Sequence, residues 1–253
     1  NAQLRNPALS SYFKPYLNVI QDRESIQVLK KFEALMTLPL GVCLPLNEGC
    51  PFLDIAANRI EAERIAKGLN PALFTLSDSH GERGKKVLQK LGLPKDAWYV
   101  TLHVREPGYR GETHENSPDS FRNADPHDYI KAIEAVTSSG GWVFRMGDPS
   151  MSELPSRPQL IDYAHHEIRS DWMDVFLGAT CSFCIGTGSG YFRIPRYFGV
   201  PVLFTNCSPG VHYFSLMEHD LALLSLLKQK NPNKFLSFQE LLTPPVSMFC
   251  SAR

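Results

Sequence analysis

The chain has 253 residues, of which 43% are apolar, enough for one large or two small packed domains. Lys and Arg together number 26, as do Asp and Glu, so no overall charge favours nucleic acid or an anionic membrane. No apolar run approaches the roughly 20 residues that span a bilayer, and no signal peptide is visible. We therefore expect a cytoplasmic protein, although its first residue, Asn1, indicates a processed chain or a fragment.

The front of the chain predicts mixed helical material with few strands. Apolar residues recur at helical spacing over residues 25–36, which predicts an amphipathic helix. Residues 54–69 predict a second helix, with Asp54 near its N-cap and Gly68 near its end. A short strand is expected at 41–44, a polar loop at 70–84, and a short helix at 85–91 before Gly92. We therefore predict a small, possibly incomplete α/β part over residues 1–95, which would lie on the acceptor side, and a second domain over 96–253.

From Trp98 onward, strand and helix patterns alternate regularly. The predicted strands are 99–104, 142–146, 159–163, 182–185 and 200–205, and the predicted helices between them are 126–137, 171–179 and 191–197. This alternation predicts a doubly wound, mostly parallel α/β sheet of the Rossmann-like type. After the last strand, the apolar sequence LALLSLLK from Leu221 predicts one more helix and then an irregular tail.

Ligands of such sheets bind outside the carboxyl ends of the strands. Three of the predicted strand ends carry polar residues or glycines suited to a ligand. These are His103 with Arg105, Gly147 with Asp148, and the loop 186–190. If the sheet is parallel, the three segments meet at one edge, and we expect the binding site there.

His103 and Arg105 follow an apolar strand and are two positions apart, so they are expected to share a face. The planar guanidinium of arginine suits phosphate oxygens, and a histidine beside it could donate a second hydrogen bond. The pair thus predicts an anion site. The alternative is that Arg105 pairs with a carboxylate such as Asp148.

The loop 186–190 reads Gly-Thr-Gly-Ser-Gly and lies between an apolar strand and a predicted helix. Backbone N–H groups in this setting can hold a phosphate, and Ser189 adds a hydroxyl donor. The loop matches neither the dinucleotide fingerprint nor the Walker motif, and it lacks the glycine pattern of a hydrolase nucleophile. The alternative is a tight turn between strand and helix. The residues predicted to contact phosphate are Thr187, Gly188, Ser189 and Gly190.

Three further charged residues have two readings each. Asp148 could accept a hydrogen bond from a base or ribose hydroxyl, or it could cap the helical turn that follows. Glu106 is a possible general acid or base beside the cation site, or a solvated loop carboxylate. Arg145 could be a second cation of the site or an edge residue of its strand.

No metal or cofactor is expected. The paired histidines His165 and His166 lack the local spacing of a metal site, and no DxD motif for a nucleotide-bound cation occurs. Cys181 and Cys184 have CxxC spacing but lie in an apolar run without a second ligand pair. We expect them to be buried thiols rather than a zinc or redox site.

Several segments together resemble the nucleotide-binding half of the fucosyltransferase-like GT-B glycosyltransferases, and a bacterial polysaccharide-type group beside them. They are LGLPKDAWYVTLHVRE, DPHDYIKAIEAV, WVFRMGDPSM, WMDVFLGATCSFCIGTGSG and FRIPRYFGVPVLFTN, which cover roughly residues 91–206. In those enzymes the HxR strand end contacts the diphosphate, an acidic residue after the middle strand contacts the nucleotide, and the serine-bearing loop contacts phosphate. The resemblance thus implies such roles for His103, Arg105, Asp148 and residues 187–190.

The resemblance implies a metal-independent, inverting glycosyltransferase with a nucleotide-diphosphate sugar as donor, for example one like GDP-fucose, and a glycan or other hydroxyl as acceptor. Arg105 and His103 would stabilise the departing diphosphate, and Glu106 is the predicted catalytic base. A non-catalytic nucleotide- or glycan-binding module of a larger assembly is the alternative from another class. A hydrolase or epimerase of nucleotide sugars is a third. Donor, acceptor, linkage and oligomeric state do not follow from the sequence.

Overall fold

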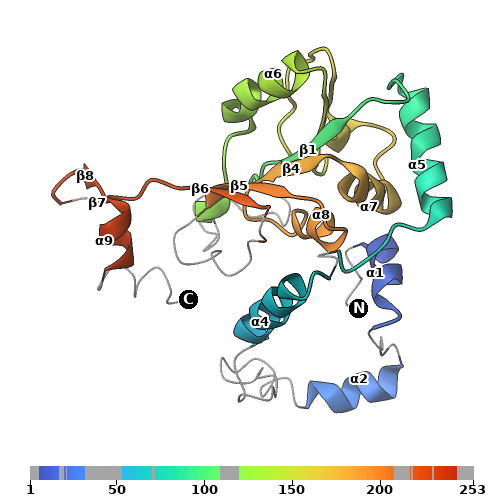
Figure 1. The fold of residues 1–253 in the computed structure, drawn as a ribbon, viewed down its shortest axis with the longest axis horizontal. Helices are drawn as coiled ribbons and strands as arrows, with labels where there is room; N and C mark the ends of the chain where they lie inside the picture. The colour runs from blue at the N-terminus through green and yellow to red at the C-terminus, as the bar shows by residue number, and fades with distance from the viewer. Residues whose placement is uncertain are drawn as a thin grey trace. The chain divides into compact units, whose positions relative to one another are not determined.

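The computed structural model describes residues 6–16, 20, 22–31, 53–69, 72–108, 120–207, 217, 219–229 and 231–243. The chain divides into two compact units, Asn1–Pro71 and Ala72–Arg253 (Figure 1). The sequence places its boundary later, between residues 95 and 96. The difference arises because helix α5 (Asp78–Lys90) packs against helix α7 (Asp171–Thr180) and so belongs to the second unit.

The first unit contains three helices within its described ranges: α1 (Pro7–Phe13), α2 (Arg23–Lys30) and α4 (Leu53–Ala66). Asp22 caps α2 by accepting a hydrogen bond from the Ser25 N–H, at 2.7 Å. The helices predicted at 25–36 and 54–69 are confirmed where they overlap α2 and α4. The strand predicted at 41–44 lies outside the described residues.

The second unit is built on a six-stranded sheet in which each strand is parallel to its neighbours. The strands lie in the order β3-β2-β1-β4-β5-β6. They are β1 (Tyr99–His103), β2 (Trp142–Arg145), β3 (Leu160–Ile161), β4 (Phe183–Gly186), β5 (Val202–Cys207) and β6 (Leu221–Leu224). This is the order of the Rossmann fold, so the predicted fold class is confirmed.

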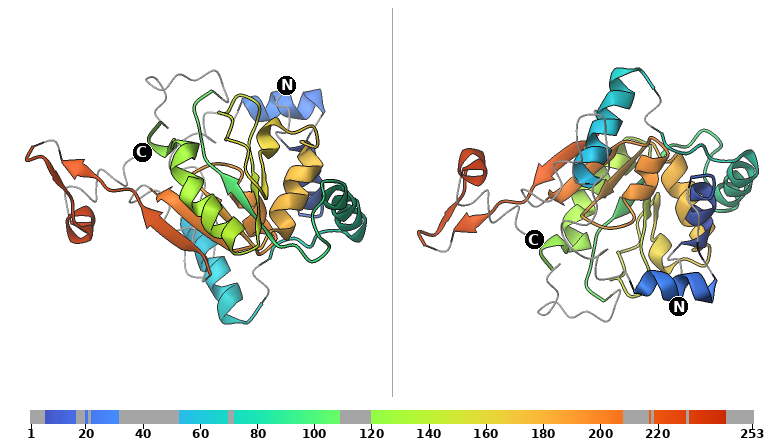
Figure 2. Two further views of the ribbon diagram at one scale, coloured as in Figure 1. Left: turned by 90° about the horizontal axis from the view of Figure 1, so that it is seen from above. Right: turned by 90° about the horizontal axis from the view of Figure 1, so that it is seen from below.

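Helices cover both faces of this sheet (Figure 2). Alternate residues of β1 enter different cores, as the two-residue period of a strand requires. Tyr99 packs with Phe176 and Leu177 of α7. Val100 and Leu102 pack instead with Ile133 and Val136 of α6 (Ile130–Ser138). The buried middle strands are therefore apolar on both faces, which is why they read as continuous hydrophobic runs.

The connecting helices form where the sequence predicts them. The 3-10 turn η2 (Pro126–Tyr129) precedes α6, and Asp125 caps it by accepting from the His127 N–H at 2.9 Å. Helix α7 coincides with the predicted 171–179. Helix α8 (Arg193–Tyr197) is only five residues long and begins two residues later than predicted. The remaining turns are η1 (Ser120–Arg122) and η3 (Tyr163–His165).

The predicted helix at Leu221 is wrong, because Leu221–Leu224 forms strand β6 at the edge of the sheet. Leu221 and Leu223 are 68% and 59% exposed, whereas Ala222 and Leu224 pack on the cluster around Phe204. Burial that alternates from one residue to the next is typical of a strand. The sequence does not show this alternation, because apolar residues occupy both the exposed and the packed positions. Two short strands, β7 (Lys228–Gln229) and β8 (Lys234–Phe235), and helix α9 (Phe238–Leu242) follow.

The polar loop predicted over 70–84 is wrong from Asp78 onward, because helix α5 begins there with Ser77 as its N-cap residue. Gly81 and Gly84 weaken the helical pattern in this stretch. Gly84 is nevertheless required, since a Cβ atom on it would lie 2.2 Å from the ring of Phe176. The glycine lets α5 approach α7 closely.

Gly84→Ala is expected to lower the free energy of unfolding by about 1–3 kcal/mol, because the methyl group must displace the buried Phe176 ring. Gly81→Ala in the same helix is the matched control, since its Cβ would have only an ordinary contact, 3.8 Å from Leu76. We expect that change to stabilise the protein by about 0.5–1 kcal/mol. Denaturant unfolding of the two variants measures both effects. Equal stabilities would contradict the close helix contact.

Candidate functional site

The candidate site lies at the carboxyl edge of the sheet, between β1 and β4. The strand order reverses at this point, and the crevice there is where open α/β sheets bind ligands. The register pairs His103, the last residue of β1, with Gly186, the last residue of β4. Strand β2 is parallel to β1, so its end at Arg145 lies at the same edge. The three segments predicted to meet at one edge do so.

The imidazole ring of His103 lies at the end of β1 and is 8% exposed. It stacks on the ring of Tyr191 with 5.3 Å between centroids and 16° between planes. Burial first, and then the nearby charge of Arg145, lower the pKa of His103 to about 4. Its Nδ1 atom is buried and has no hydrogen-bond partner among the described residues. His103 is thus a neutral group at pH 7 with hydrogen-bonding capacity to spare.

Arg105 follows after β1 has ended, so the alternation of a strand no longer sets its direction. Its guanidinium donates a hydrogen bond to the side-chain oxygen of Asn123, and its backbone N–H donates to Thr187 Oγ1 at 2.8 Å. The Thr187 N–H in turn donates to the His103 carbonyl at 3.1 Å. These bonds join the end of β1 directly to the loop after β4.

Three consecutive N–H groups in this loop donate no hydrogen bond within the described part of the chain: those of Gly188, Ser189 and Gly190. The Ser189 hydroxyl oxygen is also buried without a partner there. The loop is held in place from outside, since Thr187 is fully buried and the Gly188 carbonyl accepts from Arg122 at 3.2 Å. Successive free N–H groups in a fixed bend form a concave donor set for an anion. Helix α8 starts later, at Arg193, so the donor set belongs to the loop itself.

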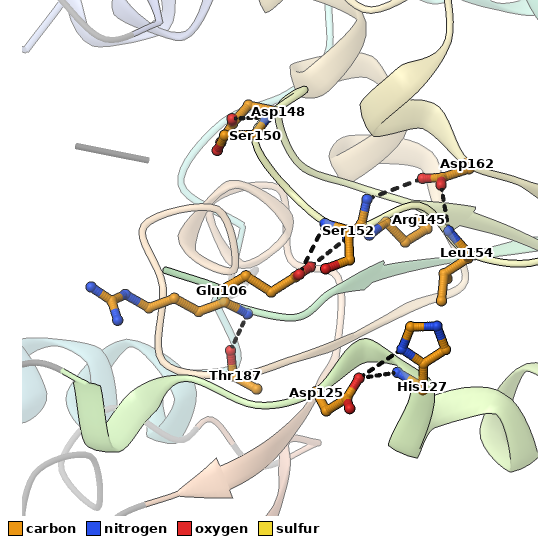
Figure 3. A network of polar contacts seen from close by, with 11 residues as sticks. Glu106, Asp125, His127, Arg145, Asp148, Ser150, Ser152, Leu154, Asp162 and Thr187 are labelled. Atoms are coloured by element: carbon orange, nitrogen blue, oxygen red, sulfur yellow. Dashed lines mark hydrogen bonds and ion pairs between the residues drawn. The ribbon is translucent and has the colours of Figure 1, made fainter. Parts of the chain in front are cut away.

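Glu106 is only 8% exposed, so its reading as a solvated loop carboxylate is wrong. One oxygen pairs with the Arg145 guanidinium at 2.5 Å, and the other accepts from the Ser152 N–H at 3.0 Å (Figure 3). Arg145 is fully buried and also pairs with Asp162 at 3.1 Å. It is therefore neither an edge residue nor a cation that can reach a ligand directly.

Gly147 and Asp148 follow β2 at the same edge. Gly147 has φ +154°, and a Cβ atom on it would lie 2.2 Å from the sulfur of Met151, so glycine is required there. Asp148 is half-buried and accepts a hydrogen bond from the Ser150 N–H at 2.9 Å (Figure 3). The contact closes a turn at residues 149–150 and caps no helix, because no helix begins near Ser150 within the described range 120–207. The charge of Asp148 also acts on His103, where it raises the pKa against the larger effect of burial.

Cys181 and Cys184 are buried free thiols, as predicted. Burial raises the pKa of Cys181 to about 11, so it stays protonated and unreactive at neutral pH. Within the described ranges, no three His, Cys, Asp or Glu side chains gather as metal ligands would. No helix in the same ranges is long and apolar enough to cross a membrane.

Three residues of the site escape the sequence analysis. Tyr191 covers the His103 ring, Asn123 accepts from Arg105, and Asp162 completes the pairing of Arg145. Only Tyr191 has a sequence signal, because it directly follows the glycine-rich loop. Asn123 and Asp162 reach the site through the folding of distant segments, which no local pattern reveals.

The depressed pKa of His103 predicts a loss of stability in acid. Between pH 6.5 and about 4 the unfolded chain takes up a proton at this residue and the native state does not. The stability is therefore present above pH 6.5 and falls by up to about 3 kcal/mol as the pH drops to 4. Asp174 acts in the opposite direction, because burial raises its pKa to about 6.

His103→Gln removes the contribution of His103 to the pH dependence of stability and keeps that of Asp174. We expect the difference in unfolding free energy between wild type and His103→Gln to shrink steadily from pH 7 to pH 4. Denaturant unfolding at several pH values measures it. Two parallel curves would show that His103 titrates normally in the native protein.

No protein-family model matches the chain, and neither does any curated protein sequence. Several solved structures show partial similarity, and three of them are glycosyltransferases. A family 9 glycosyltransferase from Veillonella parvula has 10% identity and a TM-score of 0.42 over 62% of this chain. The ADP-heptose lipopolysaccharide heptosyltransferase II of E. coli has 14% identity and a TM-score of 0.44 over 61%. The iron-containing dodecameric glycosyltransferase TibC of enterotoxigenic E. coli has 13% identity and a TM-score of 0.35 over 62%.

The chain spans less than half of each of these structures: 42%, 45% and 41% of their lengths, in the same order. Similarity at this level does not decide function. The function has to be argued from the residues of the site.

Proposed function

We propose that this chain carries the donor site of a glycosyltransferase that takes a sugar from a nucleotide-diphosphate donor. The observation that carries the proposal is the set of free donors at the reversal point of the sheet. The N–H groups of Gly188, Ser189 and Gly190 and the Ser189 hydroxyl have no acceptor among the described residues, and Arg105 is bonded to the same loop. A cation beside several free donors is suited to a diphosphate.

The same groups suit the chemistry of sugar transfer. Negative charge builds up on the diphosphate as it leaves the sugar, and fixed donors aimed at that charge lower the barrier. Arg105 and residues 187–190 supply the donors in our proposal. His103 is neutral at pH 7 and can hydrogen-bond the leaving group or the sugar without adding a second charge. Asp148, which follows the neighbouring strand, contacts the nucleoside in our proposal.

The resemblance to the fucosyltransferase-like GT-B enzymes favours a donor such as GDP-fucose, inversion at the sugar carbon, and a glycan or other hydroxyl acceptor. It also favours chemistry without a metal ion. In that scheme the protein's own cation and N–H groups replace the divalent cation that other transferases use to hold the diphosphate.

One observation favours the second candidate, a nucleotide-binding module without catalysis. Both oxygens of Glu106, the predicted base, are occupied by Arg145 and by the Ser152 N–H. A carboxylate whose two oxygens already bind buried protein donors must leave those partners before it can face an acceptor hydroxyl. A catalytic base would then have to come from another residue.

A thermal-shift screen of GDP-, UDP-, ADP-, CMP-, CDP- and dTDP-sugars tests the proposal. We expect one nucleotide family to raise the melting temperature, because a ligand that binds only the native state stabilises it. Release of the nucleoside diphosphate that depends on an added acceptor would support the transferase. Binding without release would support the module. If no compound shifts the melting temperature, the proposed donor site is wrong.

A further inference from the structure

A network of charges includes Glu106, the residue next to Arg105 of the candidate site (Figure 3). Its centre is Arg145, which is fully buried and has ion pairs to Glu106 at 2.5 Å and to Asp162 at 3.1 Å. Each carboxylate also accepts a hydrogen bond from a backbone N–H. The Ser152 N–H donates to Glu106 and the Leu154 N–H donates to Asp162, both at 3.0 Å. The network thus ties the segment after β1 to the end of β2 and to the chain that connects β2 with β3.

The network reaches the site through one peptide bond. Glu106 is the residue after Arg105, and the Arg105 N–H is itself bonded to Thr187 Oγ1 at 2.8 Å. The backbone at Arg105 is therefore held at three points: its N–H by Thr187, its carbonyl by the Ala124 N–H at 3.0 Å, and the following residue by the ion pair of Glu106. A displacement of Glu106 would act on the Arg105 guanidinium through the peptide bond that joins the two residues.

Arg145, at the centre of the network, can fix the position of neighbouring residues but is too buried to contact a ligand. Arg145 has no exposed surface, and two carboxylates occupy its guanidinium. A buried ion pair adds little net stability compared with an apolar replacement, but it restricts the geometry of its partners strongly. The position of a catalytic cation matters greatly, since a displacement of about 1 Å can cost on the order of 100-fold in rate.

We propose that Glu106 is the positioning residue of this site: its ion pair with Arg145 holds the Arg105 backbone where the guanidinium meets the diphosphate. The proposal rests on the proposed function for the identity of the ligand. It replaces the role of catalytic base that the sequence suggests for Glu106. Glu106 then acts through Arg105 and touches no substrate.

Glu106→Gln tests the proposal, because it keeps the size of the side chain and removes the charge that holds Arg145. Glu134→Gln is the matched control, since Glu134 pairs with Arg157 at 2.7 Å on the exposed side of α6. The probes are the nucleoside diphosphate that binds wild type best in the screen and its nucleoside. Calorimetry with both probes separates contacts to phosphate from contacts to the nucleoside.

We expect Glu106→Gln to weaken binding of the nucleoside diphosphate by about 10-fold and that of the nucleoside by less than about 2-fold. Glu134→Gln should change neither. A purely structural role would weaken both probes alike, and such a result would overturn the proposal. So would wild-type affinity for the diphosphate in Glu106→Gln. If Glu106→Gln does not fold, Glu106→Asp serves, because its shorter side chain keeps the charge but shifts Arg105.

Hydrogen exchange gives a readout that needs no ligand. We expect the amides of Arg105, Glu106 and Gly108 to exchange faster in Glu106→Gln than in wild type, while the core amides of β1 and α6 stay protected. Unchanged exchange at these three amides would overturn the positioning role. If wild type binds no nucleotide, the proposed function fails by itself, and the exchange measurement still decides how Glu106 acts.

Discussion

Arg145→Met is expected to lower the free energy of unfolding by about 3–5 kcal/mol, because it leaves the buried carboxylate of Glu106 and the carboxylate of Asp162, which is 18% exposed, without their cation. Methionine fills much of the space of the arginine stem, so the lost charge rather than a cavity dominates the effect. Denaturant unfolding measures the change. Burial and the two carboxylate contacts thus make this the most damaging single substitution that we predict for stability.

Two further variants separate the charge effect from packing. Arg157→Met removes an arginine from the half-exposed pair with Glu134 and should cost less than about 1 kcal/mol. The triple variant Glu106→Gln, Arg145→Met, Asp162→Asn keeps acceptors for the N–H groups of Ser152 and Leu154. It should recover most of the lost stability, since no buried charge is left unpaired. A triple variant as unstable as Arg145→Met would contradict the ion-pair account.

Arg105→Ala is expected to weaken binding of a nucleoside diphosphate by about 100-fold or more. That factor corresponds to about 2.7 kcal/mol, within the range for a charge-assisted contact in a partly buried site. Affinity for the nucleoside alone should stay within about 2-fold of wild type. Arg105→Lys should restore binding only in part, because an ammonium group lacks the planar pair of donors. Calorimetry with both ligands measures these effects.

Arg83→Ala provides the control for this experiment. Arg83 lies in α5 and stacks on the ring of Trp172 of α7, 3.7 Å from its centroid. Its removal takes away the same charge and should leave nucleotide affinity unchanged. If Arg105→Ala and Arg83→Ala bind the diphosphate equally well, Arg105 does not hold the anion.

The sheet could be predicted because most of its strands have a recognisable pattern in the local sequence. Tyr99–His103 and Trp142–Arg145 are short apolar runs bounded by turn residues, and the helices between them begin at capping residues such as Asp125. Parallel topology follows from the alternation of strands and helices, and it places the three strand ends at one edge. The location of the candidate site thus followed from sequence patterns that extend over a few residues.

The two wrong secondary-structure predictions have one physical cause. In both segments the structure depends on the distant part of the chain that packs against them. The run at Leu221 has no polar period, so only its pairing with β5 shows that it is a strand. The start of α5 was hidden by Gly81 and by Gly84, whose missing side chain makes room for Phe176. Packing contacts between distant segments produce no periodic pattern in the local sequence.

For the candidate site too, some features could be predicted from the sequence and others could not. The residue types at the strand ends, His103, Arg105 and the glycine-rich loop, were visible in the sequence. The ion pair of Glu106 with Arg145 was not, because 39 positions separate them and only the parallel register brings them together. In the sequence, an acidic residue beside a cation therefore suggests a catalytic base. Because the structure shows Arg145 as its buried partner, we propose instead that Glu106 positions Arg105.

A crystal structure of the chain with the best-binding nucleoside diphosphate tests the central claim most directly. We expect the phosphates between β1 and β4, with their oxygens about 2.7–3.2 Å from the Arg105 guanidinium and from N–H groups of Gly188, Ser189 or Gly190. Glu106 should stay paired with Arg145 in that complex. A nucleotide bound elsewhere, or one whose phosphates contact neither Arg105 nor the loop, would contradict the account.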